Sequence, residues 1–184
     1  MTAEDFHVAV ACKFVGTWNL HHVALEENLS LDFFSMLSST SGVAGQSGQA
    51  NYVAANAFLD AFAIYRRRLG LQANSIALGP MWDVGYMSRN KESLPRTNTS
   101  TFTPITEGLF HKITEYSILQ QIDMINKESV SYFIIGMAIP LKESFILRFD
   151  ARFAGLFGFV TNGYVIGNKN GSKELQVFNL LFQN

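Results

Sequence analysis

The sequence predicts an α/β fold built on a partial, doubly wound, Rossmann-like parallel sheet. Short, mostly apolar segments suited to buried strands lie at residues 31–37, 75–79 and 130–136, and longer segments with helical periodicity separate them. This alternation is typical of helices that connect parallel strands. The 184 residues, 48% of them hydrophobic, are enough for a single folded domain with a substantial core.

Residues 4–26 predict one long helix that precedes the first strand. Its apolar residues recur at helical spacing and would form one face. They are Val8, Ala11, Phe14, Val15, Trp18 and Leu25. The segment 31–37 follows and ends in Ser38 and Ser39, and its composition favours a parallel strand that is covered on both faces.

The middle of the chain predicts a loop and then a well-defined helix. Residues 40–50 are rich in Gly, Ser and Gln, which favours a loop. Residues 51–69 predict a helix that Asn51 or Gln49 starts and that Gly70 ends in the left-handed conformation.

After the second predicted strand, at 75–79, the polar segment 80–104 predicts a long loop of the kind that often has a function. Residues 106–126 predict a helix that Thr106 caps. The third strand is predicted at 130–136, which continues the alternation of helices and strands.

The pattern weakens after Pro140, so we predict that residues 1–140 form one unit and that 141–184 form a tail without a specified structure. Phenylalanines recur in the tail every four residues, which favours a helix face used for core packing over a docking surface. They are Phe145, Phe149, Phe153 and Phe157. Turn signals from Thr161 onward leave a hairpin open.

Composition excludes several classes of function. The formal net charge of −1 gives no field for nucleic acid or an anionic membrane. No stretch is long and apolar enough to predict a membrane span, and the acidic N-terminus does not resemble a secretory signal. The lone Cys12 excludes an internal disulfide, and the histidines are not spaced as metal ligands. These observations predict a cytoplasmic protein without a metal.

Four residues have the chemistry that carbonyl reduction requires. Ser39 stands 13 residues before Tyr52, Asn56 follows the tyrosine by four, and Lys13 lies in the preceding helix. A phenol with an ordinary pKa of about 10 is a poor acid near neutrality unless a nearby ammonium stabilises its anion. A serine hydroxyl at a strand end can donate to the carbonyl oxygen as negative charge develops there. Taken singly, each residue is more often structural or solvated, but their ordered combination favours a shared site.

This set resembles the catalytic centre of the short-chain dehydrogenase/reductase superfamily, specifically the ketoreductase domains of fungal highly reducing polyketide synthases. The segment from Lys13 to Leu20 is similar to the lysine-containing helix of those domains, with Phe14 in place of a valine. An asparagine four residues after the tyrosine, with the lysine upstream, is similar to the polyketide branch. The segments 60–67 and 78–86 continue the resemblance, which covers roughly residues 1–155.

The resemblance implies a stereoselective ketoreductase that transfers hydride from NADPH to a ketone of a polyketide or terpenoid intermediate. Tyr52 would donate the proton, Ser39 would orient the carbonyl, Lys13 would make the phenol more acidic, and Asn56 would complete the set. The segment after the second strand is similar to the one that contacts the nicotinamide end of the cofactor. Its residues are Gly79, Pro80 and Met81.

The sequence departs from this family in one respect, because it contains no Gly-x-Gly-x-x-Gly turn for a pyrophosphate. We therefore expect only the C-terminal catalytic half of the fold, with strands five to seven and without strands one to four. The first strand would then have an unpaired edge. A homodimer or a partner protein would restore the cofactor site. The alternative is a catalytically inactive remnant or docking module of a polyketide synthase.

Overall fold

The computed structural model describes residues 2–89, 102–122 and 130–137, together with Leu147 and Asp150. Its three strands form one parallel sheet in the order β1-β2-β3, which confirms the predicted fold class. The strands are β1 (Ser35–Ser39), β2 (Asn74–Leu78) and β3 (Tyr132–Ile135). The repeated phenylalanines of the tail and the suggested hairpin lie outside the described residues.

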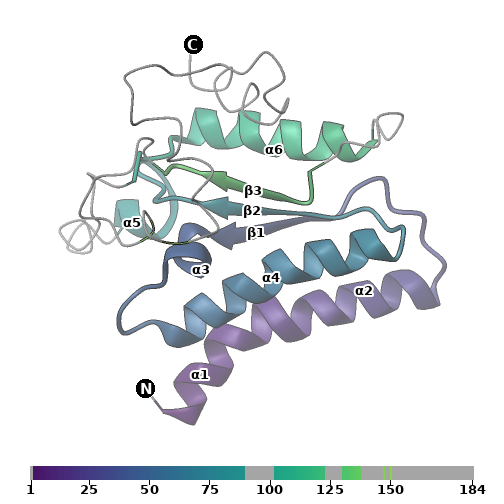
Figure 1. The fold of residues 1–184 in the computed structure, drawn as a ribbon, viewed down its shortest axis with the longest axis horizontal. Coiled ribbons are helices and arrows are strands. Elements are labelled where there is room, and N and C mark those ends of the chain that lie inside the picture. The colour runs from purple at the N-terminus through teal and green to yellow at the C-terminus, as the bar shows by residue number, and fades with distance from the viewer. Residues whose placement is uncertain (1, 90–101, 123–129, 138–146, 148–149, 151–184) are drawn as a thin grey trace.

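The helices lie on both faces of this sheet (Figure 1). They are α1 (Ala3–Val10), the π-helical segment η1 (Ala11–Val15), α2 (Gly16–Glu26), α3 (Thr40–Ala44), α4 (Ala50–Arg68), α5 (Gly85–Arg89) and α6 (Glu107–Ile122). Figure 1 shows α2 and α4 on one face and α6 on the other, while α3 and α5 lie near the ends to which the strands point. The carboxyl ends of the strands are where open α/β sheets bind ligands.

The predicted single helix over 4–26 is wrong in its middle, where η1 separates α1 from α2. The predicted apolar face is also not the buried one, since Val8 is 70% exposed. The buried residues of α2 are instead Thr17, His21 and Ala24. A wider turn rotates the faces of the helix on either side of it, so the periodicity of α1 does not continue in register into α2.

The first strand lies later than predicted and is not covered on both faces. It begins at Ser35 rather than Leu31, and Leu37 is 45% exposed. Phe34, just before the strand, instead packs its ring 4.0 Å from the guanidinium carbon of Arg66. Within the described sheet β1 is an edge strand that pairs only with β2.

Two segments predicted as loops contain short helices. Residues 40–50 include α3, and the segment 80–104 includes α5. Phe102 and Ile105 form isolated bridges with Met137 and Met81 respectively, so the end of the second segment returns to the sheet. Glycine and serine lower helix propensity without preventing a single turn when tertiary contacts hold it.

The predicted helix end at Gly70 and the predicted cap at Thr106 are confirmed, whereas the predicted end near residue 126 lies outside the described residues. Gly70 takes the left-handed conformation (φ 75°) after α4, and the Thr106 hydroxyl accepts a hydrogen bond from the Leu109 amide at 3.3 Å. The start of α4 is an exception, because Gln49 occupies the N-cap without a side-chain hydrogen bond. Asn51 instead accepts from the Tyr52 amide and donates to a carbonyl of α1.

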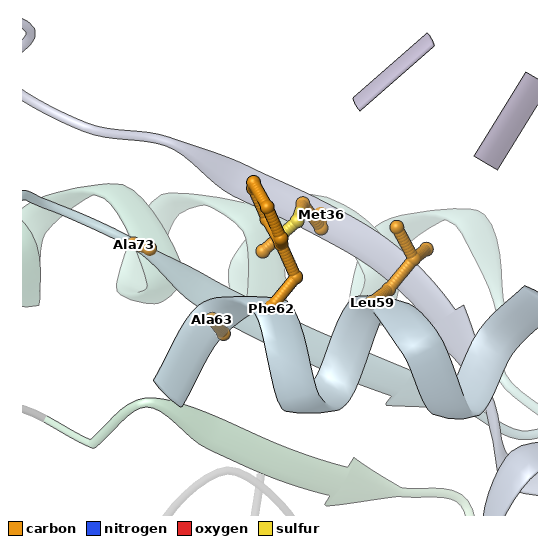
Figure 2. Packing of buried hydrophobic residues seen from close by; sticks show 5 residues of the cluster. All are labelled: Met36, Leu59, Phe62, Ala63 and Ala73. Carbon is orange, nitrogen blue, oxygen red and sulfur yellow. The ribbon is translucent and has the colours of Figure 1, made fainter. Parts of the chain in front are cut away.

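The core between α4 and the sheet is apolar and fixes the position of this helix. Leu59 and Phe62 of α4 point toward Met36 of β1 (Figure 2), and all three are buried. Ala63 and Ala73 complete the cluster. On the opposite face, buried isoleucines of the sheet pack against Ile113 of α6. Both layers hold the strand ends in place.

Candidate active site

Ser39 ends β1 and begins the next helix. It is 9% exposed and has extended backbone angles, and its hydroxyl accepts from the Ser41 amide at 3.2 Å as the N-cap of α3. The same hydroxyl lies 3.2 Å from the Ser41 hydroxyl, which in turn lies 2.7 Å from the amide oxygen of Gln46. Ser39 therefore sits at the carboxyl edge of the sheet with its side chain already oriented.

Tyr52 and Asn56 lie one turn apart on α4. The Tyr52 side chain is 36% exposed, whereas Asn56 is fully buried. The Asn56 amide group donates to the Tyr52 carbonyl at 2.7 Å, and the Asn56 carbonyl accepts from the Ser38 hydroxyl at 3.2 Å. The Asn56 side-chain oxygen is buried and has no hydrogen-bond partner among the described residues, which is unusual for a buried polar atom.

Gly42 lets α3 approach α4 closely beside these residues. A Cβ at this position would lie 3.0 Å from the Ala57 nitrogen and 3.1 Å from the Asn56 Cβ. Both neighbours belong to the rigid body of α4, so they cannot move aside independently of the helix. The contact fixes the distance between the turn after Ser39 and the helix that carries Tyr52.

Lys13 comes from the π-helical segment η1. Its ammonium donates to the Leu37 carbonyl at 2.7 Å, two residues before Ser39 on β1. Burial lowers the pKa of Lys13, while the charges of Cys12 and Asp60 act in the opposite direction. No hydrogen bond among the described residues joins this ammonium to Tyr52; the two stand on neighbouring helical segments that contact each other.

The structure therefore places the four predicted residues around the carboxyl end of β1 without joining them into one hydrogen-bonded chain. Asn56 is bonded to the backbone of Tyr52, and Ser39 is tied to its own turn. Lys13 is tied to the strand that ends in Ser39. Their roles in catalysis remain predictions.

The predicted cofactor segment lies after β2 and is packed against other backbone. A Cβ on Gly79 would lie 3.0 Å from the Gly136 carbonyl oxygen, and the Gly79 amide donates to Ile135 at 2.8 Å. The Pro80 carbonyl accepts from Ile105, and Met81 forms a bridge with the same residue. The close approach of two backbones is thus a structural reason for glycine at position 79.

A hollow of about 340 Å³ opens beside Lys13 rather than between Ser39 and Tyr52. Leu20 of α2 and Leu37 of β1 line it, together with Cys12. Leu20 is 64% exposed. The hollow is therefore part of the open side of β1 and does not hold the catalytic candidates apart from Lys13.

Sequence reasoning missed two residues that shape the site, Gly42 and Asp60. The sequence predicts a loop at Gly42, and only its contact with α4 reveals its role. Asp60 is four residues after Asn56, on the side of α4 toward the sheet, where its carboxylate accepts from the buried Ser75 hydroxyl. The sequence does contain a signal for Asp60, because a carboxylate among the apolar residues on one face of a helix is unusual.

Comparison with solved structures defines the class of fold. The structure is similar to chains described as A-type ketoreductases from a modular polyketide synthase, with a TM-score of 0.59 and 29% identity over 74% of this chain and 26% of that one. An A1-type ketoreductase gives a TM-score of 0.60 at the same identity and coverage. The described part of the chain thus has the Rossmann-like fold of these ketoreductases.

Sequence comparison agrees with the fold. Residues 1–83 match the KR domain family, a range that includes all four catalytic candidates. The chain is 48% identical, over its whole length, to a highly reducing polyketide synthase of Eupenicillium brefeldianum, and 41% identical to one of Arthrinium phaeospermum. It spans 8% of the length of each of these relatives. The tail after residue 155, for which the sequence indicated no relation, is included in both alignments.

Among the described segments, none of the helices combines the length and the hydrophobicity that crossing a lipid bilayer requires.

Proposed function

We propose that the chain is the C-terminal catalytic half of a stereoselective, NADPH-dependent ketoreductase acting on a ketone of a polyketide or terpenoid intermediate. The observation that carries this proposal is the placement of Ser39, Tyr52, Asn56 and Lys13 around the carboxyl end of β1, within the range that matches the KR domain family. That end of an open α/β sheet is where ligands bind.

The described residues fit the nicotinamide end of a cofactor better than its phosphates. Gly79, Pro80 and Met81 follow β2 on the same sheet edge as Ser39, where they would border the nicotinamide. The unpartnered oxygen of Asn56 offers an acceptor nearby. The sequence contains no Gly-x-Gly-x-x-Gly turn whose backbone amides would bind a pyrophosphate. When bound, NADPH supplies the hydride that reduces the carbonyl carbon.

The protein residues then supply the proton and the orientation. The Ser39 hydroxyl donates to the substrate oxygen, which aligns the carbonyl and stabilises the charge that develops on it. The Tyr52 phenol transfers its proton to the same oxygen, so that the ketone becomes an alcohol. The Lys13 ammonium stabilises the phenolate that remains. Tyr52 is 36% exposed, so this residue is not enclosed in the core.

The test of this assignment is the rate of NADPH oxidation with a small ketone, with Tyr52→Phe compared against Tyr65→Phe. Both residues lie on α4, and Tyr65 is 42% exposed and lies among aromatic rings away from Ser39. Loss of the proton donor is expected to lower turnover by about 100-fold or more. Tyr65→Phe should retain activity. Unchanged turnover in Tyr52→Phe would contradict the role of the phenol.

We further propose that the rest of a ketoreductase domain, from another chain or a longer polypeptide, pairs with the outer edge of β1. The Phe34 carbonyl accepts from the Asn74 amide, so the backbone groups of Phe34 point toward β2. In a parallel ladder these groups alternate in direction from one residue to the next, so the amide and carbonyl of Leu37 point away from β2. The hydrogen bond from Lys13 to the Leu37 carbonyl agrees with this direction. An open strand edge is a template for pairing. We expect the chain and such a half to form a complex, which a measurement of molecular mass in solution would detect.

One observation favours the alternative of an inactive remnant. The Lys13 ammonium is held by the Leu37 carbonyl rather than by Tyr52. If NADPH oxidation stays absent when the missing half is supplied and shown to associate, the remnant is the better description.

A further inference from the structure

Asp60 of α4 lies among hydroxyl side chains of the described sheet. The buried Ser75 hydroxyl of β2 donates to its carboxylate at 2.6 Å. The hydroxyls of Ser38 on β1 and Tyr132 on β3 lie near enough to lower the pKa of this carboxyl group. The helix side chain is thus bonded to β2 and lies near a hydroxyl of each of the other two strands.

The register of the sheet explains why these hydroxyls converge. Met36 pairs with Ser75, and Ser75 pairs with Tyr132, so these three side chains stand in a row on the same face. Ser38 lies two residues after Met36 and therefore projects from that face as well. Because Met36 packs against Leu59 of α4, the face is the one that α4 covers. The three hydroxyls form a polar spot within an otherwise apolar layer.

A carboxylate in such a layer is costly unless donors surround it. Burial raises the pKa of Asp60, while the hydroxyls of Ser75, Ser38 and Tyr132 and the charge of Lys13 act in the opposite direction. Lys13 and Tyr132 are the titratable groups that face it from η1 and β3. A leucine could fill the same space, but it would leave the buried Ser75 hydroxyl without an acceptor, so the carboxylate satisfies a polar group that apolar packing would not.

This network connects the elements that carry the catalytic candidates. Asp60 follows Asn56 by one turn and Tyr52 by two on α4. Ser38 immediately precedes Ser39, and its hydroxyl donates to the Asn56 carbonyl at 3.2 Å. Hydrogen bonds are directional, whereas the apolar contacts beside them are not. The network therefore fixes the rotation and the sliding of α4 relative to the end of β1.

We propose that Asp60 is a positioning residue of the reductase site: through the buried Ser75 hydroxyl it anchors α4 to β2, next to the hydrogen bond that joins α4 to Ser38 of β1, and this sets Tyr52 relative to Ser39. The inference rests on the proposed function for its catalytic meaning. The anchoring and the electrostatic effect on Lys13 can be measured without cofactor or turnover.

The experiment uses the full chain with Asp60→Asn, which keeps the shape of the side chain and removes its charge. The matched control is Asn74→Ala. Asn74 is fully buried and anchors β2 to α6 through two hydrogen bonds with Ser117, on the opposite face of the sheet. Melting temperature and the titration of the Lys13 side chain by NMR, assigned with Lys13→Arg, are measured for both variants.

We expect both variants to melt roughly 3 to 10 °C below the wild type, because each loses buried hydrogen bonds. Only Asp60→Asn should lower the pKa of Lys13 further, since it removes an attractive charge. It should also weaken the nuclear Overhauser contacts between the α3 turn and α4 that border Ser39. A Lys13 titration and α3–α4 contacts that match those of Asn74→Ala would overturn the proposal and leave Asp60 as a structural residue.

A milder variant keeps the proposal testable if Asp60→Asn does not fold. Ser75→Ala removes the hydroxyl that donates to Asp60 at 2.6 Å. Because that hydrogen bond favours the charged carboxylate, its loss should raise the pKa of Asp60 further, as read from the titration of its side-chain carbon. An unchanged Asp60 titration in Ser75→Ala would contradict the network. Neither result depends on NADPH binding, so failure here is distinct from failure of the proposed function.

Discussion

Replacement of Gly42 by alanine tests whether the contact between α3 and α4 holds the site together. The added Cβ would lie 3.0 Å from the Ala57 nitrogen and 3.1 Å from the Asn56 Cβ, closer than such atoms normally approach. Forcing an extra methyl group into a packed contact costs about 1–3 kcal/mol. Exchanging glycine for alanine in a helix raises the free energy of unfolding by about 0.5–1 kcal/mol. The expected net loss is therefore centred near about 1 kcal/mol and is at most about 2.5 kcal/mol.

The assay is thermal unfolding followed by circular dichroism, with Gly108→Ala as the matched control. Gly108 lies in α6, and no atom lies within 4 Å of a Cβ placed there, so its variant should equal or exceed the wild type in stability. For a chain of this size, Gly42→Ala should melt about 2 to 8 °C lower. If Gly42→Ala melted as high as Gly108→Ala, the close contact between α3 and α4 would be refuted.

Three further predictions concern the stability of the described fold. Phe62→Ala, which empties the centre of the cluster in Figure 2, should cost about 3–5 kcal/mol in urea unfolding, and a loss below about 1 kcal/mol would contradict that packing. Asp83→Ala should cost about 1 kcal/mol, because both carboxylate oxygens accept from the first amide of α6; equal stability would show that this cap is not formed. Burial and the charge of Arg66 hold the pKa of His21 below its ordinary value of 6.5. As the pH drops below about 6.5, the unfolded chain therefore binds a proton at His21 before the folded chain does. The free energy of unfolding should fall over this range, down to the folded-state pKa of His21. His21 contributes at most about 1.4 kcal/mol per pH unit to the slope of the free energy of unfolding against pH. In urea unfolding at several pH values, this contribution should disappear in His21→Gln but persist when the exposed His111 is replaced by Gln.

The sequence predicted the alternation of helices and strands well because that signal is local. Residues 75–79 became β2 with a shift of one residue, and 51–69 became α4 with the same shift. Gly70 has no Cβ to hinder the left-handed conformation, so its role as a helix end depends on no distant contact. Elements set by composition and backbone sterics are thus readable from the chain alone.

The predictions that were wrong concern features that depend on tertiary contacts. The π-helical segment η1 breaks the register between α1 and α2, and no residue type within it announces a wider turn. α3 is a single turn held against α4 through Gly42, whereas its composition indicates a loop. Leu31 lies outside β1 although the local sequence is apolar, because pairing with β2 begins at Ser35.

In the candidate site, too, some features could be predicted from the sequence and others depend on tertiary contacts. A motif identifies Ser39, Tyr52 and Asn56, and the structure places them at the end of β1 and on α4. The partner of the Lys13 ammonium, the Leu37 carbonyl, could not be read from spacing, because it depends on how the edge of β1 lies against η1. The role of Asp60 likewise follows only from the register of three strands.

The central claim, that this chain supplies the catalytic half of an NADPH-dependent ketoreductase, is tested most directly by a cofactor titration. NADPH is added to the chain alone and to the chain mixed with the nucleotide-binding half of a related ketoreductase, while the fluorescence of Trp18 and Trp82 is followed. Trp82 is 45% exposed and comes directly after Met81 in the predicted cofactor segment. The account predicts saturable micromolar binding in the mixture and much weaker binding by the chain alone. An associated mixture that fails to bind NADPH up to millimolar concentration would contradict it.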